Sequence, residues 1–272
     1  MVNALCDRYD ITTDLRTTTP LTGEMVSEFT NGVPANYTEY VSLLGSLLYI
    51  GRTVRPDILV GIVQLAQFQA NPRKLHFRRL LHILQYLRNT SNYNLVLRRS
   101  DHLNLDVYSD ASLGNSFDRK SFTGSIVFIG GALVVFTSRK SDLVALSTNE
   151  SEIIAASEAM KDLLFVKSIL CALLHPLPSD SSTAINREHC LECATPTLFV
   201  DNTGTIAFVD RGFARRNKYL EVRNAALSDY SRKGYFLVKH VESSENPADC
   251  LTKNLRFVTL DYQRRLLGIL PA

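Results

Sequence analysis

Four acidic residues that lie far apart in the sequence could together form a reactive site. Asp110 and Asp201 each end a stretch of alternating or apolar residues, the pattern of a buried strand. Asp249 follows Asn-Pro-Ala at the start of a helical stretch, where a helix N-terminus favours an anion. Any one of these residues alone is more simply a turn or helix cap. Because strand ends at one edge of a mixed sheet converge, we expect the acids to meet there.

The fourth acid, Glu152, lies in the first turns of a long predicted helix. Ala155, Ala156 and Ala159 follow it at i+3, i+4 and i+7, so its carboxylate shares the small-residue face that packs on the sheet. Glu150 is the alternative, but its register turns it away from the alanines. A carboxylate on a closely packed face indicates a cationic partner beneath it.

Four converging carboxylates repel one another unless cations compensate their charge. Mg²⁺ prefers oxygen ligands and retains several waters. Two such ions about 4 Å apart can activate a water molecule and stabilise a leaving oxygen during phosphodiester hydrolysis. The sequence therefore predicts a catalytic site with two Mg²⁺ or Mn²⁺ ions, held by Asp110, Glu152, Asp201 and Asp249.

The elements that would position these acids follow from the spacing of the apolar residues. Three helices, at about 40–51, 58–69 and 76–87, form a small helical module. Strands are predicted at 103–110, 124–129, 132–138, 197–201 and 234–241, with the second and third joined as a hairpin at Gly130 and Gly131. Further helices are predicted at 147–174, after residue 201, at 218–231 and at 248–255. The fold class is α/β, with a mixed five-stranded sheet flanked by helices and preceded by the helical module.

The chain divides into four predicted segments. Residues 1–36 are an extended lead-in, rich in Thr, Gly and Pro and without a sustained period. The helical module covers 37–95, the α/β domain covers 96–256, and a helical tail covers 257–272.

The net charge of +3 over 272 residues is unevenly distributed. No Asp or Glu occurs from residue 58 to residue 100, a stretch that contains seven basic residues: Arg73, Lys74, Arg78, Arg79, Arg88, Arg98 and Arg99. Such a surface fits a polyanionic partner, although a solvated helix face has the same composition. The candidate nucleic-acid contacts are Arg73, Lys74, Arg78, Arg79, Arg119 and Lys120.

The five cysteines, an odd number, favour free thiols in a reducing compartment. His189, Cys190 and Cys193 make half of a zinc knuckle, but no second ligand pair lies at suitable spacing, so a loop with incidental thiols is favoured. No apolar segment reaches the roughly 18 residues that span a bilayer. We therefore expect no membrane contact, and a location in the cytoplasm or the nucleus.

Several stretches together resemble one known family. YSDASLG, STNESEIIAASEA, LFVDNTGTI and ENPADCLTKNL resemble the ribonuclease H domain of copia-type retrotransposon polyproteins. Upstream, YVSLLGSLLYIGRTVRPDILVGIVQLAQF and HFRRLLHILQYLRNT resemble the thumb or connection region of the reverse transcriptase in the same polyproteins. The resemblance runs from about residue 19 to residue 255.

This resemblance implies a ribonuclease H-like fold and a metal-dependent endonuclease that cleaves the RNA strand of RNA/DNA hybrids. Asp110, Glu152, Asp201 and Asp249 would be the metal ligands, and the 2′-hydroxyl would mark the RNA strand. The Tyr-x-Asp-Asp signature of the polymerase is absent. The chain is therefore expected to act with the polymerase part of the same polyprotein, in the cytoplasm or in a virus-like particle. The alternative is a catalytically inactive relic that still binds nucleic acid.

Overall fold

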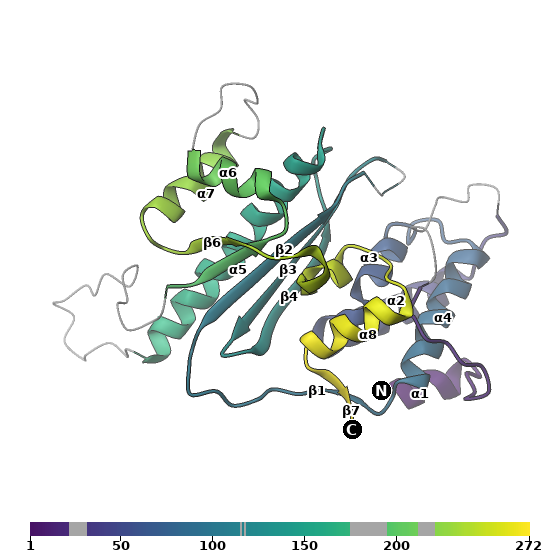
Figure 1. Cartoon of the computed structure of the whole chain (residues 1–272). Coiled ribbons are helices and arrows are strands. Elements are labelled where there is room, and N and C mark those ends of the chain that lie inside the picture. The colour runs from purple at the N-terminus through teal and green to yellow at the C-terminus, as the bar shows by residue number, and fades with distance from the viewer. Residues whose placement is uncertain (22–31, 115, 117, 175–194, 212–220) are drawn as a thin grey trace, which may run out of the picture.

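The computed structural model describes residues 1–21, 32–114, 116, 118–174, 195–211 and 221–272 (Figure 1). At its centre is a five-stranded sheet with the strand order β4-β3-β2-β5-β6. The strands are β2 (Leu105–Ser112), β3 (Phe122–Ile129), β4 (Ala132–Lys140), β5 (Thr197–Val200) and β6 (Leu237–His240). Neighbours among β2, β3 and β4 are antiparallel, whereas β5 is parallel to β2 and β6 is parallel to β5. This mixed five-stranded sheet, flanked by helices, confirms the predicted α/β fold class.

Two glycines turn the chain between β3 and β4. Gly130 and Gly131 have φ angles of +55° and +78°. Residues with a side chain rarely adopt such angles, and consecutive positive φ angles match the twist of a two-residue hairpin. The predicted hairpin is therefore confirmed.

One face of the sheet is covered by helices (Figure 1). These are α5 (Thr148–Leu174), α6 (Thr203–Arg211) and α7 (Glu221–Arg232). Ala156 and Ala159 of α5 are fully buried in a core cluster with Val107 of β2 and Leu198 of β5. The alanine face predicted to pack on the sheet does so, and it fixes the position of the first turns of α5.

The predicted helical module is confirmed upstream of the sheet. It consists of α2 (Tyr37–Thr53), the 3-10 turn η1 (Pro56–Ile58), α3 (Leu59–Ala66) and α4 (Lys74–Asn89). Asn36 caps α2, because its Oδ1 accepts a hydrogen bond from the backbone N of Glu39 at 3.3 Å. The inward faces of these helices share a core cluster that includes Leu43, Leu47 and Leu84.

A short helix also forms in the segment predicted to be an extended lead-in. Helix α1 (Val2–Arg8) buries Leu5 and Cys6, which join the core cluster of the helical module. This expectation was wrong for residues 2–8. A helix of seven residues is too short to show a period in the sequence, and it is stabilised mainly by packing against the rest of the protein.

Elements from the C-terminal part of the chain lie beside the sheet, and the turn η4 (Pro247–Leu251) among them contacts β2 and β3 on the other face (Figure 1). They are η3 (Ser243–Glu245), η4 (Pro247–Leu251), α8 (Phe257–Leu266) and β7 (Ile269–Pro271), which pairs antiparallel with β1 (Tyr93–Leu95). The tail predicted to be helical therefore ends in a strand. Leu59 of α3, Ile126 of β3 and Leu251 of η4 share one core cluster, so the module, the sheet and these elements pack together. The boundaries near residues 36, 95 and 256 stay a prediction.

A buried polar network joins α8 to the helical module. Arg55 donates to both carboxylate oxygens of Asp57, from Nε to Oδ1 at 2.9 Å and from Nη2 to Oδ2 at 2.8 Å. The hydroxyl of Tyr86 donates to Asp57 Oδ2 at 2.6 Å and accepts from Arg264 Nη1 at 2.9 Å. The network holds the segment that follows η4 against the module.

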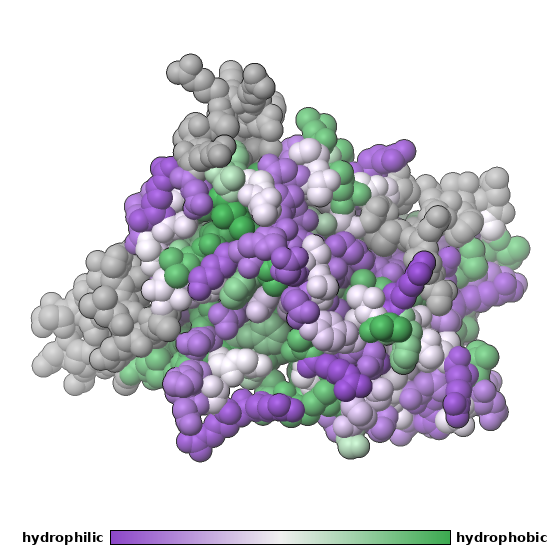
Figure 2. All heavy atoms as spheres, viewed as in Figure 1, coloured by the Kyte–Doolittle hydropathy of each residue, from purple (hydrophilic) through white to green (hydrophobic). Residues whose placement is uncertain are grey.

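The described helices include none that is long and apolar enough to cross a membrane. The face seen in Figure 2 carries hydrophilic and hydrophobic residues side by side. The predicted loop with Cys190 and Cys193, and the first residues of the helix predicted at 218–231, lie outside the described residues.

Candidate functional site

Asp110 lies inside β2, whereas the sequence analysis placed it at the end of the strand. Ala111 and Ser112 continue the pairing with β3, and both residues are buried. Asp110 is in register with Gly124, and none of its side chain is exposed. Its carboxylate is therefore surrounded by protein rather than by water.

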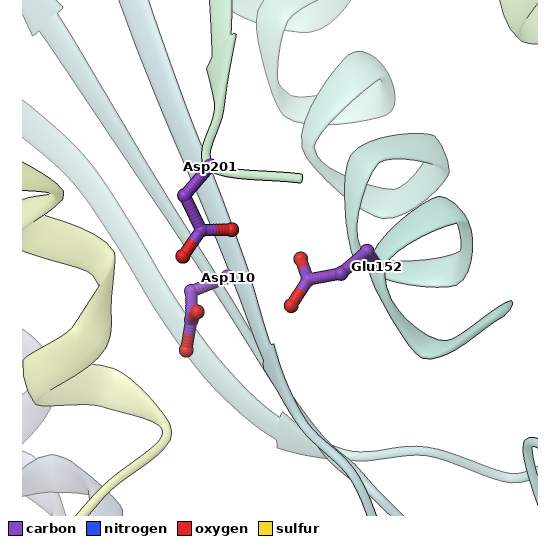
Figure 3. Close-up of side chains that lie close together, drawn as sticks. All are labelled: Asp110, Glu152 and Asp201. Atoms are coloured by element: carbon purple, nitrogen blue, oxygen red, sulfur yellow. The ribbon is translucent and has the colours of Figure 1, made fainter. Parts of the chain in front are cut away.

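Glu152 and Asp201 approach Asp110 from two other elements (Figure 3). Among the described residues, each of these three acids offers one carboxylate oxygen, and the three oxygens lie within 4.8 Å of one another. Asp201 directly follows β5, the parallel neighbour of β2, and Glu152 extends from the first turns of α5 towards both aspartates. The alternative acid, Glu150, accepts a hydrogen bond from the backbone N of Leu146 at 2.8 Å and so contributes to the start of α5.

Burial and mutual repulsion destabilise the charged forms of two of these acids. Burial, followed by the charge of Asp249, raises the pKa of Asp110 to about 7. Burial, followed by the charges of Asp110 and Asp201, raises the pKa of Glu152 to about 9. At neutral pH the cluster therefore takes up either a proton or a cation.

The two carboxylate oxygens of Glu152 have different surroundings. Oε1 accepts a hydrogen bond from the backbone N of Ala111 at 3.3 Å, whereas Oε2 is buried without a hydrogen-bond partner among the described residues. A buried acceptor without a partner is costly. Hard divalent cations such as Mg²⁺ and Mn²⁺ take carboxylate oxygens as ligands, so the cluster of Asp110, Glu152 and Asp201 fits a divalent ion.

Asp249, the fourth predicted ligand, is not one of the three clustered acids. It lies in η4, and one ammonium group links it to Asp110: Lys253 Nζ donates to Asp249 Oδ1 at 2.7 Å and to Asp110 Oδ1 at 3.2 Å. The turn η4 can come this close to β3 because Gly124 lacks a side chain. A Cβ atom there would lie 3.0 Å from the carbonyl oxygen of Ala248.

Comparison with known proteins gives a consistent set of relatives, although no protein-family model matches the chain. Over 232 residues, the chain is 30% identical to the retrovirus-related Pol polyprotein from transposon TNT 1-94 of Nicotiana tabacum, an alignment that covers 85% of this chain and 16% of that protein. Over 235 residues, it is 28% identical to the retrovirus-related Pol polyprotein from transposon RE2 of Arabidopsis thaliana, covering 86% of this chain and 15% of that protein. The chain belongs to the retrovirus-related Pol polyproteins of copia-type transposons.

This Pol chain spans about one sixth of the length of the two curated relatives, 16% and 15%. Its structure is similar to that of ribonuclease H1 from Halobacterium salinarum, with a TM-score of 0.35 and 16% sequence identity over 55% of this chain and 94% of that one. A similarity at this level assigns no activity.

Three residues of the Pol chain that were not predicted from the sequence hold the acids in place. Thr252 Oγ1 donates to the second oxygen of Asp110, and Ser243 Oγ donates to Asp201 Oδ2 at 3.0 Å. These contacts cross 142 and 42 residues, so no local spacing indicates them. The third residue, Lys253, was detectable, because an acid and a lysine four residues apart lie on one helical face.

The predicted nucleic-acid contacts of the Pol chain lie in two places. Four are at the start of α4, and two are in the loop between β2 and β3: Arg73, Lys74, Arg78, Arg79, Arg119 and Lys120. Gln67, at the end of α3, ties the β2–β3 loop to the helical module, because its Oε1 accepts hydrogen bonds from Ser116 Oγ at 2.9 Å and from Lys140 Nζ, at the end of β4, at 2.7 Å. The loop follows the end of β2 that carries Asp110. Arg119 and Lys120 therefore lie towards the end of the sheet where the acids gather.

Proposed function

We propose that this chain is the ribonuclease H part of a Pol polyprotein and hydrolyses the RNA strand of RNA/DNA hybrids with Mg²⁺ or Mn²⁺. The observation that supports this proposal is the meeting of Asp110, Glu152 and Asp201 from three separate elements, with oxygens within 4.8 Å of one another. Folding brings three buried or half-buried carboxylates together at a cost that a bound cation would offset. Membership of the Pol family supplies the substrate class.

In this proposal, Asp110, Glu152 and Asp201 hold the divalent ion. When bound, such an ion supplies an activated water and compensates the charge that develops on the phosphate oxygens. The chain itself orients the ligands. Thr252 fixes one oxygen of Asp110, Ser243 fixes one oxygen of Asp201, and the backbone N of Ala111 fixes one oxygen of Glu152.

The basic residues at the start of α4 and in the β2–β3 loop would bind the phosphate backbone of the hybrid. Lys74, Arg78 and Arg119 are exposed. Contacts of this kind weaken as salt rises, with a slope of roughly one unit in log affinity against log salt per neutralised phosphate. We further propose that the polymerase part of the same polyprotein delivers the hybrid, in the cytoplasm or a virus-like particle.

The test is a cleavage assay with a hybrid whose RNA and DNA strands carry different labels. We expect cleavage of the RNA strand alone with Mg²⁺ or Mn²⁺, complete loss with EDTA, and a loss of at least about 100-fold in Asp110→Asn. Asp101→Asn is the matched control, because exposed Asp101 precedes the opposite end of β2. Binding of the hybrid without cleavage in either metal would instead favour the inactive relic.

The binding surface has its own test. Replacing Arg78 and Arg79 together with alanine should weaken hybrid binding equally for all sequences and flatten its salt dependence. Replacing Arg98 and Arg99, which are exposed in the segment before β2, removes the same charge away from the proposed surface. Equal losses from both pairs would contradict the proposed location of the hybrid.

A further inference from the structure

Lys253 places a cation at one particular pair of carboxylates. Its Nζ lies 2.7 Å from Asp249 Oδ1 and 3.2 Å from Asp110 Oδ1. The backbone N of Lys253 also donates to the backbone O of Asp249 at 3.0 Å. The turn that begins in η4 therefore continues to Lys253 and aims its side chain back at the two acids.

The site contains two groups of carboxylates that share Asp110. The first is the cluster of Asp110, Glu152 and Asp201, whose oxygens lie within 4.8 Å of one another. The second is the pair of Asp110 and Asp249, with the ammonium between them. In the first group Glu152 Oε2 is buried without a partner among the described residues, whereas in the second group both acids have an oxygen bonded to Lys253. The two groups thus differ in whether the chain already provides a cation.

A second divalent ion at Asp110 and Asp249 would have to displace this ammonium. The two acid oxygens that face each other there are already hydrogen-bonded to Lys253. The second oxygen of Asp110 is engaged as well, because it accepts from Thr252. A divalent ion beside an ammonium at contact distance is repelled in a partly buried site, and the side chain of Lys253 is only 38% exposed.

We propose that the ammonium of Lys253 acts as the second cation of this site, so that the chain binds one divalent ion tightly and not two. This inference rests on the proposed function and revises the count of two ions that the sequence predicted. The divalent ion belongs to Asp110, Glu152 and Asp201, and the charge of the pair formed by Asp110 and Asp249 is compensated by the chain itself. Lys253 is a positioning residue here, because it acts through the two aspartates.

The experiment is a Mn²⁺ titration of the metal-free chain, in which the electron paramagnetic resonance signal of free Mn²⁺ gives the number of ions bound. We expect one tight ion in the wild type. In Lys253→Met we expect two, because the second ion should bind roughly ten-fold tighter or better once the ammonium is gone. Lys253→Arg retains the charge and should retain the count of one. Lys161→Met is the control, because Lys161 is exposed and pairs only with Glu158 among the described residues.

Two tight ions in the wild type, or the same count in the wild type and Lys253→Met, would overturn the inference. Binding of no ion would overturn it too, together with the proposed metal centre. Two tight ions in the wild type would overturn the inference even if Lys253→Met does not fold. The cleavage assay tests the proposed function separately. Cleavage together with two tight ions would support the ribonuclease function and contradict the role of Lys253. One tight ion without cleavage would support the role of Lys253 and contradict the ribonuclease function.

Discussion

Replacing Glu152 with glutamine should change how the stability of the metal-free chain depends on pH. Burial, and then the charges of Asp110 and Asp201, raises the pKa of Glu152 from its ordinary value of 4.5 to about 9. A group whose pKa is raised by folding stabilises the folded state fully below its unfolded pKa, and this contribution is lost as pH rises through the folded pKa. For Glu152 the loss extends from about pH 4.5 to about pH 9. Glutamine keeps the shape of the side chain and does not titrate.

The size of the effect follows from the number of protons involved. Over this range the folded state holds one proton on Glu152 that the unfolded state has released. Each unit of rising pH therefore lowers the free energy of unfolding by about 1.4 kcal/mol. From pH 5 to pH 8 the wild type should therefore lose about 4 kcal/mol relative to Glu152→Gln. Other titrating groups, including Asp110, are common to both proteins and largely cancel in the difference. Urea unfolding in EDTA at pH 5, 6.5 and 8 measures it.

A divalent ion should reverse this difference. At pH 8, excess Mg²⁺ should stabilise the wild type more than Glu152→Gln, because a ligand that binds only the folded state shifts the unfolding equilibrium in proportion to its affinity. At pH 5 the same addition should have little effect on either protein, since protons then occupy the site. If the wild type and Glu152→Gln show parallel pH profiles in EDTA, the carboxylate is not held in the buried cluster that the structure describes, and this reasoning is refuted.

Further predictions concern the neighbours of the acids and the link to the helical module. Gly124→Ala would place a carbon 3.0 Å from a backbone oxygen of η4. We expect it to cost about 1–3 kcal/mol in urea unfolding and to reduce hybrid cleavage by displacing the η4 turn. Thr252→Val removes the donor to Asp110 and should cost about 1–3 kcal/mol, whereas Thr252→Ser, which keeps the hydroxyl, should retain most of the stability and cleavage. Asp57→Ala leaves the buried guanidinium of Arg55 without its carboxylate. It should cost about 3–5 kcal/mol of stability while the cleavage rate per folded molecule stays the same.

The sequence predicts the fold well where a pattern is local. Alternation and the two glycines at 130 and 131 predict the strands and the hairpin, and the alanine stripe predicts which face of α5 meets the sheet. The pairing of β1 with β7 was missed, because each strand has three residues and the partners lie more than 170 positions apart. Helix α1 was missed for a similar reason. Its seven residues owe their conformation to packing rather than to a period.

The site shows the same division between local and long-range information. The side-chain directions of Glu150 and Glu152 follow from the helical period: Glu152 lies with Asp110 and Asp201, whereas Glu150 bonds to the backbone at the start of α5. The count of ions is a different matter, because it depends on which cation sits between Asp110 and Asp249. Four acids in a sequence predict that a cation compensates their negative charge, but they do not predict whether that cation is a metal ion or a lysine. That distinction appears only when the turn after η4 is seen to aim Lys253 at both aspartates, and the ion count of the wild type decides it.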